Sequence, residues 1–426
     1  MKSLEKKKVE ASLPFAVQLF SEFEWLEDRG PRLNPAFQGT SREQTSMALG
    51  FTKKTRYGLD AELSYNSIRE DYTGRPTQFF ALNDFYTNNL TFSVEQSLIR
   101  NSFGAQSRNE EKALYLQYEA EHLMAEREAV QVLVTAEKSY WALAFNEEIV
   151  KTLGESVKRA GSILEYNKKR FKRNVIENGD VLQANAGYLL RQLDHEEAKN
   201  NYTQFLKDYR SMIESSKSIT PPLDAPSYKE ALSYKVPEMT AKSANYLSRL
   251  RQTKAAKARL KALKESAKPD LKFFASLVTG DIRANYSDSN EGAFGTDNPV
   301  TTVGIRFSTP LAFGKINTLF DAYTEEAVAA ELSLSRLAVE ERVEKDKLIK
   351  RFTDLQARLK LSQDLELAQK KKLENEKKYQ KRGRSTTYQV LLFEQDYLNS
   401  QVSGLRLRLE LMNVYSDFKN FQRLKL

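Results

Sequence analysis

Histidine, cysteine and paired carboxylates are the side chains that most often bind metals or act as nucleophiles and bases, and this sequence offers few useful combinations of them. Cysteine is absent, and the only two histidines, His122 and His195, are far apart, each within a helical tract. A histidine metal site or a catalytic triad is therefore not expected. Glu110 and Glu111 lie in a charged helical run, and no glycine-rich phosphate loop or HExxH motif occurs. We predict no enzyme activity, no cofactor and no metal site.

The charged residues point to solvated helix faces. The chain has 66 Lys and Arg against 57 Asp and Glu, a net charge of +9. The two signs are interleaved, as where Glu147 and Glu148 precede Lys151, and they do not form a basic stripe. Nucleic acid is not expected as a partner.

Long helices should dominate the fold. Only 17 Gly and 11 Pro occur in 426 residues, and long tracts have no helix breaker. No run of about 18 apolar residues is present, so a transmembrane helix is not expected. Residues 1–8 are charged and no apolar run follows, so no signal peptide is visible. This absence argues against export, unless the numbering starts within a mature or truncated product.

Two halves of the sequence repeat one pattern with an offset of about 210 residues. Residues 90–98 and 303–311 each alternate apolar and polar side chains and run into a helical tract. Pro310 should end the second strand, because proline cannot donate a ladder hydrogen bond. Predicted strand-to-helix transitions therefore fall at Ser97, Leu98, Pro310, Leu311 and Gly314.

The far ends of these helical tracts also match, because residues 170–182 align with 379–391 and place Asn174 opposite Gly383. Asn and Gly most readily adopt the left-handed conformation that ends a helix. Each segment is predicted to be a helix-hairpin tip. Heptad spacing on both sides indicates coiled-coil packing, and a helix over 104–171 would be about 100 Å long.

These patterns predict a mainly α chain with some β structure, built as a tandem repeat of two long coiled-coil hairpins and four strands. The first repeat, 1–218, would hold an N-terminal helix around 11–27, strands at about 46–66 and 89–98, and a hairpin at about 104–215 with its tip near 174. Residues 219–226 would be a linker. The second repeat, 227–426, would hold a helix, strands at about 271–286 and 300–311, and a hairpin at about 314–423 with its tip near 383.

The strands have a pattern typical of a membrane barrel. Within 46–66 most odd positions, from Met47 to Phe51 and from Tyr57 to Tyr65, are apolar or aromatic, and most even positions are polar or charged. A soluble sheet packed on a core would show the same alternation, but here it occurs in two pairs, each joined by a polar loop at 69–88 or 287–299. Four strands cannot close a barrel, and open edges in lipid would leave backbone groups unpaired. Several copies must therefore assemble.

The order of elements, twice over, resembles the TolC-like outer-membrane efflux proteins across essentially the whole chain. The matching motifs are Arg170-Phe171 with Asp180-Val181-Leu182, Pro310-Leu311 with Gly314, and the segment 230–238. The resemblance implies a homotrimer with a twelve-stranded barrel in the outer membrane of a Gram-negative bacterium. An α-helical tunnel would extend into the periplasm and dock onto a periplasmic adaptor and an inner-membrane pump. Departures occur at Ser97, Asn174 and Gln389.

The resemblance also suggests site residues. The docking tips would be Asn174, Val175, Ile176, Glu177, Gly383, Arg384, Ser385 and Thr386, unless these are simple turns. Asp180 could narrow a pore electrostatically or only cap the returning helix. Gln389 stands where related channels can carry a pore-narrowing aspartate. The basic run 370–384 could steer an acidic partner, or be a solvated coil face.

The rival hypothesis is a coiled-coil protein without a channel, either a periplasmic adaptor or a structural scaffold. It accounts for the heptads and for the absence of a visible signal peptide. It does not explain why alternating strands occur twice, each leading into a helix.

Overall fold

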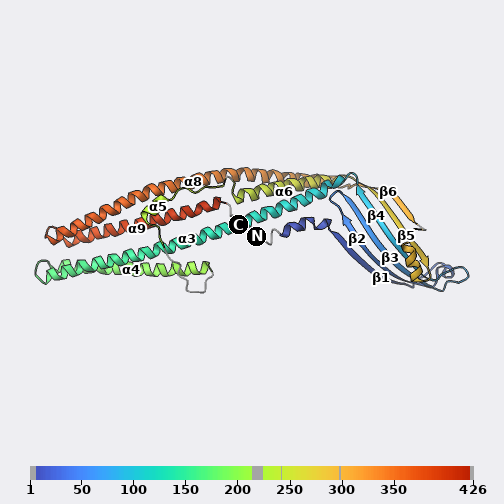
Figure 1. Ribbon diagram of the computed structural model, residues 1–426, viewed down its shortest axis with the longest axis horizontal. Coiled ribbons are helices and arrows are strands. Elements are labelled where there is room, and N and C mark those ends of the chain that lie inside the picture. The colour runs from blue at the N-terminus through green and yellow to red at the C-terminus, as the bar shows by residue number, and fades with distance from the viewer. Residues whose placement is uncertain (1–5, 214–223, 241, 297–298, 423–426) are drawn as a thin grey trace. The chain divides into compact units, whose positions relative to one another are not determined.

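A computed structural model describes residues 6–213, 224–240, 242–296 and 299–422 (Figure 1). The predicted linker therefore lies partly outside the described residues. The chain forms two compact units, and each combines segments from both halves of the sequence. One unit comprises residues 1–122 and 248–335, and the other comprises 123–247 and 336–426. The predicted boundaries of the two repeats stay a prediction.

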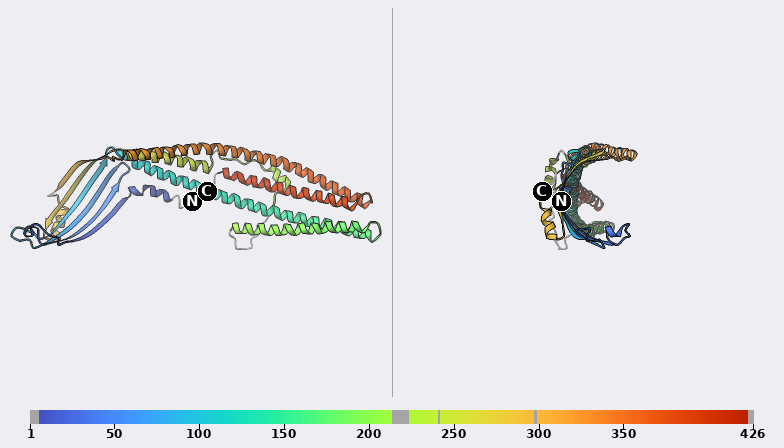
Figure 2. Two further views of the ribbon diagram at one scale, coloured as in Figure 1. Left: turned by 180° about the vertical axis from the view of Figure 1, so that it is seen from behind. Right: turned by 90° about the vertical axis from the view of Figure 1, so that its right-hand side faces the viewer.

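The first unit contains a six-stranded antiparallel sheet in the order β1-β2-β3-β4-β5-β6 (Figure 1). Its strands are β1 Val17–Asp28, β2 Ser41–Lys54, β3 Leu59–Thr73, β4 Asp84–Ser97, β5 Asp270–Arg283 and β6 Val300–Ser308. Short helices flank and connect them: η1 Lys8–Phe15, α2 Pro35–Gln38, η2 Ser102–Gly104 and α7 Tyr286–Ala293. Seen end-on, the sheet is curved, and α7 lies on its convex side (Figure 2).

Two sequence predictions about this sheet are wrong. The expected helix around 11–27 is a short 3-10 helix followed by β1. The expected single strand at 46–66 is the β2–β3 hairpin, with a tight turn at 55–58. The turn has four residues, so Phe51 and Leu63 pair across it and odd positions stay on one face. The apolar residues therefore occupy odd positions on both sides of the turn, although the polar run 52–56 and Gly58 mark the turn in the sequence. The described residues form six strands, so the predicted number of four strands is wrong.

Helices, most of them long, dominate the remaining described residues. They are α3 Ala105–Phe171, α4 Asn178–Met212, α5 Tyr228–Ser233, α6 Ala244–Ser266, α8 Phe313–Lys381 and α9 Thr387–Asp417, which runs into η3 Phe418–Phe421. In the second unit, α4 returns beside α3 and α9 returns beside α8 (Figures 1 and 2). No helix among the described residues is long and apolar enough to cross a membrane.

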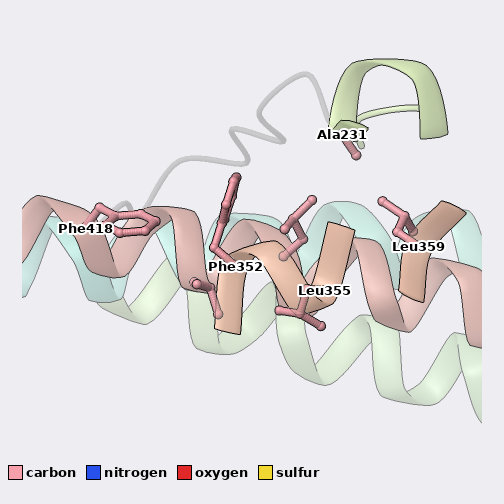
Figure 3. Packing of buried hydrophobic residues seen from close by; sticks show 7 residues of the cluster. Ala231, Phe352, Leu355, Leu359 and Phe418 are labelled. Carbon is pink, nitrogen blue, oxygen red and sulfur yellow. The ribbon is translucent and has the colours of Figure 1, made fainter. Parts of the chain in front are cut away.

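The largest apolar cluster of the second unit joins α5 to the second hairpin (Figure 3). Ser227 and Glu230 form a reciprocal capping box that fixes the start of α5. This places Ala231 against a buried cluster from α8, α9 and η3: Phe352, Leu355, Leu359, Leu411, Val414 and Phe418. The predicted fold class, a mainly helical chain with two long hairpins and a sheet, is confirmed.

Candidate membrane-facing sheet and hairpin tips

One face of the sheet carries an exposed apolar row that crosses the first five strands. Register places Leu19, Phe51, Leu63, Phe92 and Leu277 next to one another from β1 to β5. Their side chains are exposed, as are those of Val303, Ile305 and Phe307 on β6. A band of this kind is what a barrel presents to lipid. We call these eight residues the apolar belt.

The opposite face is mainly polar. The neighbouring cross-strand row contains Gln18, Thr52, Glu62, Ser93, Ser276 and Thr302. Glu95 on this face pairs with Lys272, and with Arg306 at 3.2 Å. A groove of about 420 Å³ is lined by residues of β2 to β6, among them Thr52, Glu62, Ser93 and Ser276 of this row. Such a surface is suited to water.

The helix α7 covers part of the belt face at the end of the sheet away from α3. The buried Ser289 hydroxyl accepts from the Asn88 N–H at 3.0 Å and donates to the Asp281 carbonyl at 2.8 Å. The Tyr65 hydroxyl donates to the Asn290 side chain at 2.7 Å. The predicted polar loop at 287–299 therefore contains a helix fixed by hydrogen bonds, although residues 297–298 lie outside the described residues.

The two strand-to-helix transitions are built differently. β4 ends at Ser97, and the Leu98 N–H donates to the Leu271 carbonyl at 2.8 Å. The chain then turns sharply at Gly104, whose φ is +74° and where a Cβ would lie 1.7 Å from the Arg56 carbonyl oxygen. Only glycine fits there, and the sequence patterns did not single it out. Positive φ at Asn101 and Phe103 marks the same turn.

At the second transition β6 ends at Ser308, just before Pro310, and α8 begins at Phe313. Leu311 is exposed. Gly314 lies in the first turn of α8, and a Cβ there would meet nothing within 4 Å. The described contacts therefore do not require glycine at this position.

The two hairpin tips end their first helix with the same hydrogen-bond pattern. At the first tip Val175 N–H donates to the Arg170 carbonyl at 3.0 Å and Asn174 N–H to Phe171 at 2.8 Å. At the second, Arg384 N–H donates to Tyr379 at 2.9 Å and Gly383 N–H to Gln380 at 3.0 Å. Each is a Schellman motif with a left-handed residue, Asn174 at φ +53° and Gly383 at φ +74°. The two tips are thus equivalent in structure.

Comparisons with solved structures bear on the whole chain. CusC matches with a TM-score of 0.73 and 11% identity over 99% of this chain and 87% of that one. The open state of the Neisseria gonorrhoeae outer-membrane channel MtrE matches with a TM-score of 0.70 and 14% identity, over 99% of this chain and 83% of that one. The Campylobacter jejuni outer-membrane channel CmeC matches with a TM-score of 0.68 and 13% identity, over 100% of this chain and 82% of that one. This chain has the fold of the TolC-like outer-membrane channels. No protein-family model and no curated protein matches it by sequence.

Within this TolC-like fold, the predicted tip residues are exposed, except for the half-buried Ile176 and Ser385. Asp180 is half-buried in the first turn of α4, where a carboxylate is favoured by the helix dipole. Gln389 is exposed, and its N–H donates to the Thr386 hydroxyl at 3.2 Å, which caps α9. Their roles in docking or pore constriction stay predictions.

A buried ionic cluster near the tips joins the two hairpins, and the sequence patterns missed it. Glu394 on α9 is only 1% exposed. Its Oε1 accepts from Arg159 Nε at 2.7 Å and from the Ser156 hydroxyl at 3.2 Å, both on α3. Lys377 Nζ on α8 lies 3.9 Å from Oε2. Burial lowers the pKa of Lys377, and the nearby Glu394 carboxylate opposes that shift.

Two further hydrogen bonds add to this connection between hairpins. The buried Thr387 hydroxyl donates to the Asn167 side chain at 3.0 Å. Arg191 on α4 donates to Gln395 on α9 and also pairs with Asp194 at 2.8 Å. Part of the predicted basic run is engaged as well, because Lys372 pairs with Asp396 at 3.1 Å. Steering of a partner by the remainder stays a prediction.

The described residues contain no group of three or more His, Asp or Glu side chains that could hold a metal ion. The absence of an enzymatic activity stays a prediction.

Proposed function

We propose that this protein is the outer-membrane exit duct of a tripartite efflux or type I secretion system in a Gram-negative bacterium. The observation that carries the proposal is the sheet, which has an exposed apolar belt on one face and a polar row on the other. The fold shared with outer-membrane channels agrees with it.

The proposed mechanism makes and breaks no covalent bonds. Several copies, three by resemblance to the TolC-like proteins, close their sheets into one barrel with the belt toward lipid and the polar face toward water. The helical hairpins continue the conduit into the periplasm. The tips at Asn174–Glu177 and Gly383–Thr386 dock onto a periplasmic adaptor, which connects to an inner-membrane pump. The contacts around Glu394 then hold the two hairpins of each copy together near these tips.

A periplasmic adaptor or a scaffold is the weaker candidate. The function of such a protein does not require an exposed apolar belt on a six-stranded sheet. In water that belt would favour aggregation. No feature of the described residues favours it over the duct.

The proposal is tested by expression behind a signal peptide, followed by membrane fractionation and an export assay in cells that lack their own duct. We expect a heat-labile oligomer in the outer membrane that restores export. Alanine substitutions at the eight tip residues should reduce export while the amount of oligomer stays normal. Glu196→Ala, on the exposed face of α4, is the matched control. Unchanged export from every tip variant would rule out the docking role, and a soluble monomer would rule out the duct.

A further inference from the structure

The sheet has two open edges, β1 and β6, among the described strands. Exposed edges normally carry prolines or lysines that prevent pairing with another chain. Neither residue occurs in β1 or in β6. Because neither strand contains proline, every backbone N–H along these two edges can donate to a partner strand. In lipid an unpaired edge would cost several kcal/mol for each unsatisfied backbone group.

We propose that β1 of each copy pairs with β6 of its neighbour, so that every copy places all six strands in the barrel wall. This inference rests on the proposed function. Because the sheet is antiparallel throughout and six is even, β1 and β6 run in opposite directions, and their pairing continues the antiparallel order around the ring. Three copies would then form a wall of eighteen strands, not the twelve that four strands per copy imply.

The β1–β2 hairpin belongs to the wall because the apolar belt runs onto it without interruption. Leu19 pairs with Phe51, and Phe51 pairs with Leu63. Further along β1, Phe23 is 71% exposed and Trp25 is 54% exposed on the same face. If this hairpin folded away, β3 would become the edge and these side chains would lose their place in the lipid-facing band.

The two edges are also chemically complementary. On the polar face β1 presents the exposed acids Glu22 and Glu24, and β6 presents Arg306. Arg306 already pairs with Glu95 of its own copy at 3.2 Å but keeps an exposed side chain. On the belt face, apolar Leu19 and Phe23 would meet Val303, Ile305 and Phe307. Cross-strand pairs of both kinds stabilise sheets.

The expected consequence is a wider duct. Barrel diameter grows roughly linearly with strand number, so eighteen strands give an opening roughly one and a half times as wide as twelve. The conduit at the membrane would then accept bulkier cargo than a twelve-stranded wall.

Disulfide cross-linking in outer membranes tests the proposal directly, because the natural chain has no cysteine. Ser21→Cys on β1 is combined in turn with Thr301→Cys, Val303→Cys and Ile305→Cys on β6, all of which point to the belt face. After oxidation, at least one pair should give covalent dimers and trimers on a denaturing gel. Each single-cysteine variant should give none.

Two further pairs make the outcome decisive. Ala61→Cys on β3 with the same β6 series reports the rival arrangement, in which β1 and β2 lie outside the wall. Ser21→Cys with Leu49→Cys joins cross-strand neighbours within one copy and controls for oxidation. Ladders from β3–β6 pairs, or an outer-membrane oligomer with no β1–β6 ladder, would overturn this inference and leave the duct intact. Failure to form any outer-membrane oligomer would instead overturn the proposed function.

Discussion

Gly404 on α9 packs directly against Tyr228, the first residue of α5. A Cβ at this position would lie 1.7 Å from the Tyr228 hydroxyl, so even alanine forces the ring or the helix to move. We expect Gly404→Ala to lower the free energy of unfolding by about 1–3 kcal/mol, the usual cost of overpacking. Urea denaturation followed by circular dichroism measures the change.

Gly179 on α4 is the matched control, because a Cβ there meets nothing within 4 Å. Gly179→Ala should be neutral or stabilise the protein by up to about 1 kcal/mol through helix propensity. Equal losses of unfolding free energy in Gly404→Ala and Gly179→Ala would show that the contact with Tyr228 does not cause the destabilisation.

The left-handed residue of each tip should tolerate only residues that accept positive φ. Asn174→Gly should be neutral or stabilising, whereas Asn174→Val should cost about 1–2 kcal/mol. Gly383→Asn and Gly383→Val form the same pair at the second tip. Thermal unfolding of all four variants provides the measurement, and a tolerated valine at both tips would contradict the described turn geometry.

The lowered pKa of Lys377 predicts a pH dependence of stability. Between the lowered pKa of folded Lys377 and the ordinary lysine value of 10.5, the unfolded chain binds more protons than the folded one, so stability rises with pH in that window. Lys377→Met should flatten this rise relative to the natural protein. Lys381→Met, at an exposed position of the same helix, is the control, and an unchanged slope in Lys377→Met would contradict the assignment.

At the scale of elements, the Arg159–Glu394 pair couples α3 to α9. We expect Glu394→Gln to cost about 1.5–3 kcal/mol, because it weakens charge-assisted hydrogen bonds to a buried carboxylate. A double-mutant cycle with Arg159→Met should give a coupling energy of about 0.5–3 kcal/mol. Additive effects would mean that the Arg159–Glu394 pair does not couple the two helices.

The helices and tips could be predicted from sequence because their determinants are local. Heptad spacing and a left-handed residue are both visible within a few positions of Asn174 or Gly383. The strands were miscounted because apolar residues occupy odd positions on both sides of the β2–β3 turn, although the polar run 52–56 was an available sign of that turn. Burial of Glu394 depends on the approach of α3 and α8, although its position three residues after Leu391 and four before Leu398, which follows the heptad spacing, was an available sign.

At the scale of the whole molecule, a single chain leaves the sheet incomplete. In the proposed duct, the belt requires a lipid environment and the open edges β1 and β6 require partners. Assembly of several copies satisfies both requirements at once, which explains why one chain can carry a sheet that is apolar on one face and polar on the other.

Ion conduction by the assembled protein tests the duct most directly. Oligomer extracted from outer membranes is added to a planar lipid bilayer, and the current is recorded at fixed voltage. We predict discrete upward steps of current as water-filled pores insert. A correctly assembled oligomer that never raises the current of the bare bilayer would contradict the account.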